Sequence, residues 1–162
     1  MRNDPSPTQT DTDSGDRNLV LADKRNISRV KARTSAFQLI FQQNVNAKDM
    51  KDLLEERDAS EVPLDAFGVR LIRMTLENLS EIDSAIQPHL KRWTLSRLPK
   101  VSLAILRISC AQLFYINKEE LPASVVINEA VELAKKFGAE DEYSFVNGTL
   151  RSICSALTEE KP

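Results

Sequence analysis

The sequence predicts an all-α protein. From about position 24 onwards, apolar residues recur at three- and four-residue steps, which is the period of amphipathic helices. No segment alternates apolar and polar residues for long enough to require a strand, and the one β-prone run, at 125–127, lies inside a helical pattern. The length of 162 residues favours one domain. We therefore expect six or seven helices arranged in two packed halves.

The chain divides into a polar N-terminal segment and one helical domain. Residues 1–23 carry five Asp against Arg2 and Arg17 and hold a single short apolar cluster. Such a segment buries too little apolar surface to offset its ordering entropy, so we expect a disordered acidic tail. The domain should then span 24–162, with halves at about 24–90 and 97–158 that are separated at Pro88 and over 93–99.

The first helix is expected to carry an apolar stripe and a basic stripe side by side. The apolar stripe follows helical spacing and comprises Ile27, Val30, Thr34, Phe37, Phe41 and Val45. Arg25, Arg29 and Arg33 step by four and predict a row of guanidinium groups beside it, with Lys31 on the opposite flank. A short helix is expected over 48–57, then a loop over 58–63 and a long helix over 64–86.

Three helices are expected in the second half. An apolar helix spans 101–116, and after a turn a second helix spans 125–137, with Gly138 in the C-cap position. Asp141 is a candidate N-cap for a last helix that runs to about Leu157. Asn147-Gly148 within that helix predicts a close approach of another helix, so that a large residue at Gly148 would overpack the contact.

Composition excludes several classes of protein. The net charge of -2 and the 28% of charged residues are those of an ordinary globular protein. No apolar run approaches the roughly 18 residues of a membrane span, and the N-terminus lacks the apolar core of a signal peptide, so we expect a cytoplasmic protein. Cys110 and Cys154 lack CxxC spacing and are expected to be buried thiols.

The sequence carries no recognisable catalytic pattern. His89 is the only histidine and has no second residue at metal-ligand spacing. GxSxG, HExxH, P-loop and GxGxxG motifs are absent from the sequence. We expect no enzymatic activity, no metal site and no cofactor.

A basic run is the strongest functional signal. Residues 24–33 hold five cations and no acid. Such a cluster can neutralise successive phosphates of a nucleic acid, and arginine also stacks on unpaired bases. A solvated helix face explains the same cluster equally well. Composition alone does not separate RNA from DNA or from an acidic protein.

Two segments of the second half carry a family resemblance. VINEAVELAKKFG at 126–138, followed by FVNGTL at 145–150, resembles the paired signature of the NusB family. VSLAILRI at 101–108 and the arginine-rich helix that runs into AFQLIFQ at 36–42 are similar to further segments of that family. The resemblance extends over about residues 24–157.

The resemblance implies a bacterial transcription antitermination factor built from two three-helix subdomains, without catalysis or cofactor. Family members bind the boxA element of nascent ribosomal RNA leader transcripts together with the ribosomal protein NusE, and the complex joins RNA polymerase. Some form homodimers, so a helical homo-oligomeric module with only non-specific RNA affinity is the alternative. An RNA methyltransferase with a NusB-like domain is disfavoured, because a chain of this length has no room for the catalytic domain.

Carried onto this chain, the resemblance implies two sets of site residues. The RNA-binding set comprises Lys24, Arg25, Arg29, Lys31, Arg33, Lys135, Lys136, Phe137 and Asp141. The NusE-binding set comprises Phe41 and Arg107. A core position for Phe137 and an internal salt bridge for Arg107 are equally open, since an unpaired guanidinium within an apolar helix would be costly. Ser102 and Gln112 stand where relatives can carry an acid.

Overall fold

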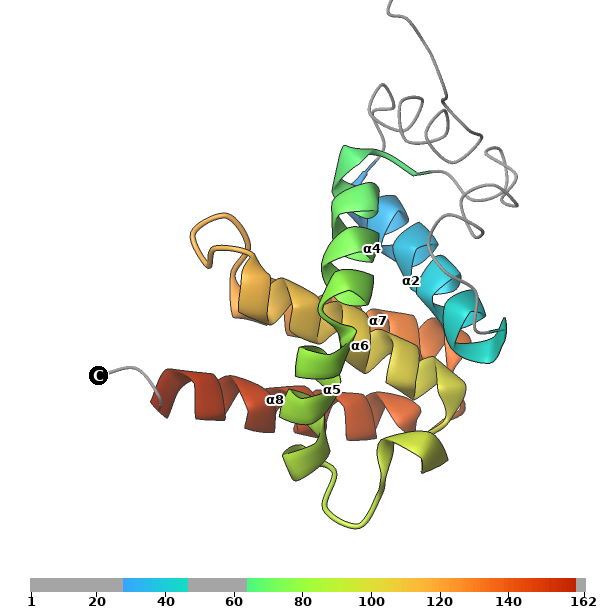
Figure 1. The fold of residues 1–162 in the computed structure, drawn as a ribbon, viewed down its shortest axis with the longest axis vertical. Coiled ribbons are helices and arrows are strands. Elements are labelled where there is room, and N and C mark those ends of the chain that lie inside the picture. The colour runs from blue at the N-terminus through green and yellow to red at the C-terminus, as the bar shows by residue number, and fades with distance from the viewer. Residues whose placement is uncertain (1–27, 47–63, 160–162) are drawn as a thin grey trace, which may run out of the picture.

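The computed structural model describes residues 28–46 and 64–159, and over these ranges the chain is helical (Figure 1). The helices are α2 (Arg29–Asn46), α4 (Ala66–Glu77), α5 (Leu79–Ile86), α6 (Lys100–Tyr115), α7 (Ala123–Phe137) and α8 (Glu142–Glu159), with two short 3-10 helices, η1 (Gln87–His89) and η2 (Leu95–Arg97). The described ranges contain no strand, and the all-α prediction is confirmed. The acidic tail over 1–23 and the helix predicted over 48–57 lie outside the described residues.

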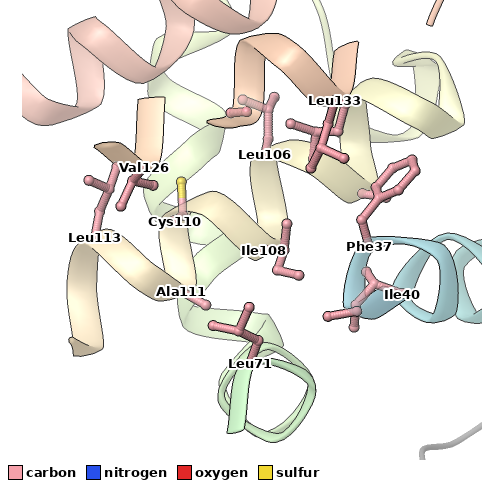
Figure 2. Packing of buried hydrophobic residues seen from close by; sticks show 14 of the residues in the cluster. Phe37, Ile40, Leu71, Leu106, Ile108, Cys110, Ala111, Leu113, Val126 and Leu133 are labelled. Carbon is pink, nitrogen blue, oxygen red and sulfur yellow. The ribbon is translucent and has the colours of Figure 1, made fainter. Parts of the chain in front are cut away.

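Helix α6 lies at the centre of the fold. It packs against α2, α4, α5, α7 and α8, and most of its residues are buried. Figure 2 shows its side chains pointing to both sides: Leu106 lies towards Leu133 of α7, and Ala111 lies towards Leu71 of α4. One hydrophobic cluster therefore runs through the predicted halves, and the division at about 90–97 stays a prediction.

Helix α2 buries a different face from the predicted one. It begins where the Ser28 hydroxyl accepts a hydrogen bond from the Lys31 N–H at 3.2 Å, as an N-cap does. Its buried face is built from Ala32, Ser35, Ala36, Phe37, Leu39 and Ile40, together with Arg33. Val30 is 56% exposed, so the predicted apolar stripe is wrong at this position. The cause is that the small residues Ala32 and Ala36 face α4 and α6 and let these helices approach α2 closely, so that Val30 lies on the solvent side.

The single helix predicted over 64–86 is two helices. Asp65 caps the first by accepting a hydrogen bond from the Gly68 N–H at 2.9 Å. The break falls at Asn78, whose backbone leaves the helical region at φ -119° and ψ 24°. Its side-chain amide donates to the carbonyl of Met74 at 2.8 Å and satisfies one of the carbonyls that the helix end leaves without a partner.

The second half follows the predicted order closely. Helices α6, α7 and α8 match the expected ranges to within about two residues, which is the usual variation at helix ends. Cys110 is a buried free thiol, and burial raises the pKa of this thiol far above its usual range; Cys154 is a half-buried free thiol. No described helix is both long and apolar enough to cross a bilayer.

The two glycines of the second half have opposite surroundings. Gly138 follows α7 with φ -96°, so it does not adopt the left-handed conformation that is typical of a C-cap glycine. A Cβ there would lie 2.8 Å from the carbonyl oxygen of Ala134 and 3.0 Å from the Glu142 carboxylate. Gly148 is exposed, and a Cβ on it would meet nothing within 4 Å. The close contact predicted at Gly148 is therefore wrong, because α8 turns Val146 and Leu150 to the core instead.

These surroundings predict opposite effects of alanine at the two glycines. Gly138→Ala should lower the free energy of unfolding by about 1–3 kcal/mol through overpacking. Gly148→Ala should raise it by about 0.5–1 kcal/mol, because glycine is a poor residue inside a helix and nothing obstructs the new methyl group. Denaturant unfolding of the full chain measures both variants. A loss at Gly148 as large as the loss at Gly138 would contradict the described environment.

Candidate nucleic-acid interface

A groove lies between α2 and α7. Its lining is mixed in charge and comprises Val30, Arg33, Thr34, Glu129, Glu132, Leu133, Lys135 and Lys136. The two lysines come from the last turn of α7 and are exposed to solvent. Cations in a last helical turn also interact favourably with the negative end of the helix dipole. We call this feature the α2–α7 groove.

Arg29 is held in place by an aromatic ring. Its guanidinium carbon lies 3.8 Å from the centroid of the Phe67 ring, which is a short cation–π distance. Phe67 belongs to α4 and is itself buried. Arg29 is therefore an exposed cation whose position is fixed by stacking, with a charge that remains accessible. Lys31 is exposed as well, as predicted.

Arg33 points inward and does not continue an outward row. It is only 5% exposed, its Nε donates to Gln112 Oε1 at 3.0 Å, and its guanidinium carbon is 5.2 Å from the Phe67 ring. Burial lowers the pKa of Arg33, while the charge of Glu129 opposes that shift. Arginine nevertheless keeps its proton at ordinary pH, so the structure buries a cation. The outward stripe is wrong at Arg33, and RNA contact by this residue stays a prediction from a position on the groove wall.

The remaining predicted cations divide by location. Lys24 and Arg25 lie outside the described residues. Lys135 Nζ is 3.9 Å from Glu132 Oε2 and 5.2 Å from the Tyr143 ring. Lys136 Nζ is 5.3 Å from the ring of its neighbour Phe137. An exposed ion pair of this kind holds a lysine only weakly, so these amines are available to an incoming phosphate.

Phe137 and Asp141 mark the end of α7 and the turn that follows. The Phe137 ring is half-buried and lies 5.1 Å from the Phe37 ring, so this residue anchors α7 to α2. Asp141 is exposed in a turn held by Glu142. Glu142 Oε1 accepts from the Ala139 N–H at 3.1 Å, and Oε2 accepts from the Ser102 hydroxyl at 2.7 Å. RNA contacts by Phe137 and Asp141 stay predictions.

Two carboxylates and one ring in this region are absent from the predicted set. Glu129 and Glu132 line the α2–α7 groove. Glu132 lies three and four residues before Lys135 and Lys136, and Glu129 lies three residues before Glu132; this spacing indicates a shared face of α7, so the sequence did hold this signal. Phe67 stacks on Arg29 from a different helix, and no local pattern reveals such a pairing.

The two residues implied for NusE binding lie elsewhere. Phe41 is half-buried on α2, with its ring 6.2 Å from that of Phe37. Arg107 makes an internal ion pair with Asp83: Nε donates to Oδ1 at 2.9 Å and Nη2 donates to Oδ2 at 2.7 Å. The salt-bridge interpretation of Arg107 is thus observed, and partner contact by either residue stays a prediction. No group of three metal-ligating side chains occurs among the residues that the structure describes.

The buried contact between Arg33 and Gln112 generates a prediction about stability. Gln112→Leu removes the acceptor of a buried cation and should lower the free energy of unfolding by roughly 2 kcal/mol. Gln112→Glu keeps an acceptor and adds the opposite charge, so it should retain the wild-type stability or exceed it. Thermal and denaturant unfolding measure both. Equal losses for the two variants would show that Arg33 does not depend on this partner.

Comparison with known proteins identifies the family to which this chain is similar. The model of the NusB family matches residues 30–155. The transcription antitermination protein NusB of Oceanobacillus iheyensis is 38% identical over 127 residues, which cover 78% of this chain and 98% of that protein.

Solved structures agree. NusB of T. maritima superposes with a TM-score of 0.71 at 34% identity, covering 81% of this chain and 93% of that one. The crystal structure of the antitermination factors NusB and NusE in complex with double-stranded RNA gives a TM-score of 0.70 at 27% identity, covering 79% and 96%. Because the family model and the relatives span nearly all of the described helices, the chain belongs to the NusB family.

Proposed function

We propose that this chain is a transcription antitermination factor that binds the boxA element of nascent ribosomal RNA transcripts together with the ribosomal protein NusE. Such binding would support processive transcription of ribosomal RNA as part of an RNA polymerase antitermination complex. The observation that carries the proposal is the α2–α7 groove, a concave surface bordered by the exposed Lys135 and Lys136 of α7, with the exposed cations Arg29 and Lys31 on the same helix α2 that forms its other wall. The similar NusB and NusE structure, which contains RNA, supports both partners.

Exposed cations on α7 and α2 favour an RNA backbone, and they are of two kinds. Lys135 and Lys136 are exposed on flexible stems and can follow phosphates at variable spacing. Arg29 is fixed over Phe67 and so loses less conformational entropy on binding. Binding through these charges releases counterions and weakens as salt rises. No bond is made or broken in this role, and it needs no cofactor.

NusE contact is proposed through Phe41 and Arg107. Phe41 presents part of an aromatic ring at the surface of α2, which suits an apolar contact with a protein. Arg107 is 13% exposed beside Asp83, so a partner would meet a pre-formed ion pair rather than a lone cation. The alternative is a homo-oligomeric module with only non-specific RNA affinity.

A titration of boxA RNA against scrambled RNA of equal length, with and without NusE and at two salt concentrations, tests the proposal. We expect tighter binding to boxA, a gain with NusE and a loss with salt. Lys136→Gln should weaken binding and reduce the salt slope by about one unit, whereas Lys118→Gln, an exposed cation in a distant turn, should change little.

The opposite result is equally informative. Equal affinity for the two RNAs without a response to NusE would reject the antitermination role. Light scattering on the free protein would then show whether the homo-oligomer is the better account.

A further inference from the structure

We propose that a second hollow, between residues 89–93 and α8, takes one unpaired nucleotide of single-stranded RNA. This inference rests on the proposed function and extends it to a part of the surface that holds none of the RNA-binding residues implied by the NusB resemblance. The hollow is bordered on one side by His89, Lys91, Arg92 and Trp93, and on the other by Gly148 and Ser152. In Figure 1 the loop lies below α8, far from the N-terminal end of α2.

The backbone of Trp93 is held by hydrogen bonds on both sides, and the residue is 49% exposed. The side-chain amide of Gln87 donates to the Trp93 carbonyl at 3.0 Å and accepts from the Leu95 N–H at 3.2 Å. The Trp93 N–H in turn donates to the Leu90 carbonyl at 3.1 Å. An indole on a fixed backbone, half out of the protein, is a ready platform for stacking a base.

The charges in the hollow on the α8 side of this ring favour a phosphate. Lys91 and Arg92 are exposed, and none of the described residues that line the hollow is a carboxylate. The α2–α7 groove, by contrast, contains Glu129 and Glu132. Lys91 is held at φ 57°, a conformation that residues other than glycine rarely adopt. A nucleotide suits this lining, because its flat base can stack on Trp93 and its phosphate can contact Lys91 and Arg92.

Hydrogen-bonding groups complete the far side. His89 Nδ1 lies 2.7 Å from the Ser152 hydroxyl, which places a paired polar group on the α8 side of the hollow. Hydroxyl and imidazole groups can exchange hydrogen bonds with a ribose 2′-hydroxyl, which is the group that distinguishes RNA from DNA.

Gly148 explains why the hollow is open. Glycine inside a helix is less stable than alanine, and no neighbour here requires its small size, since an added Cβ would meet nothing within 4 Å. Packing therefore gives no reason for glycine at this position. As part of the lining of a binding hollow, however, the missing side chain leaves room for a ligand next to Trp93.

The hollow continues towards the predicted RNA surface. On its other side Trp93 borders a neighbouring hollow that is lined by Phe145 and by three acids, Glu140, Asp141 and Glu142. An RNA strand that leaves the end of α7 would have to pass the 139–141 turn with its phosphates turned to solvent, away from these carboxylates, to reach the indole. The second site would lengthen the contact along one strand.

The chain contains one tryptophan, so its intrinsic fluorescence reports on Trp93 directly. We would titrate the full chain with a short single-stranded boxA RNA and follow tryptophan emission and, with a labelled RNA, anisotropy. Stacking should quench the emission with the same midpoint as the anisotropy change. Trp93→Ala should weaken binding by about tenfold or more, and Trp93→Phe should recover most of the affinity.

Two further variants separate binding from folding. Gly148→Leu should fill the hollow and weaken RNA binding several-fold while its thermal midpoint stays at or above that of the wild type, because a Cβ at this helical position meets nothing within 4 Å and the rest of the side chain can extend into the hollow. Arg92→Glu should weaken binding, and the matched reversal Lys118→Glu in the distant turn should not.

The outcomes distinguish this inference from the proposed function. RNA binding seen by anisotropy, with unchanged tryptophan emission and wild-type affinity of Gly148→Leu, would overturn the second site alone. Quenching that is equal for boxA and scrambled RNA would support the second site and overturn boxA recognition. The absence of RNA binding by either readout would overturn both.

Discussion

A helix that is enclosed by others must find partners for its own polar side chains, and α6 does so with a different neighbour for each. Ser102 donates to Glu142 of α8, Arg107 pairs with Asp83 of α5, and Gln112 accepts from Arg33 of α2. A buried polar group without a partner costs about 1–3 kcal/mol, so each of these bonds is a requirement of the fold. Together they fix how three surrounding helices are rotated about their own axes.

That constraint extends to the candidate nucleic-acid interface. The bond between Arg33 and Gln112 sets the rotation of α2, and the same rotation places Arg29 over Phe67 and turns Lys31 outward. At the other end, the bond between Ser102 and Glu142 anchors the turn that carries Asp141. The two ends of the interface are thus positioned relative to a single central helix. A surface that is already arranged before binding loses less entropy when RNA arrives.

The fold class and the helices of the second half follow from periodicity, because long apolar stripes around 101–116 and 125–157 leave few alternatives. The rotation of α2 does not follow from it. Periodicity predicts that large apolar residues such as Val30 are buried. The buried face of α2 is instead formed in part by Ala32, Ala36 and the buried Arg33. The partner of that arginine is 79 residues away, on α6. Only the packed structure brings them together.

In the candidate site, too, some features can be predicted from the sequence and others depend on the packed structure. Its cations are visible in the sequence as a run at 24–33 and a pair at 135–136, since charge clusters are local features. The separate roles of these cations are not visible in the sequence, because only an exposed cation can contact a phosphate. Arg33 is buried in the core, and the sequence does not show this. Gly148 misleads for a similar reason: a glycine that permits close packing and one that leaves open space look identical in a sequence.

If the α2–α7 groove binds RNA as proposed, its acids would make that binding selective. Glu129 and Glu132 lie among the cations, and the whole chain carries a net charge of -2, so long-range attraction of a polyanion is weak. A phosphate that enters in the wrong register meets a carboxylate, which penalises non-specific RNA more than it penalises a correctly placed strand. Under the proposed function, affinity would then have to come from several short contacts made at once, and a second bound partner would raise it by keeping the RNA near the groove. A mixed-charge groove of this kind suits a factor that works in an assembly rather than one that coats RNA alone.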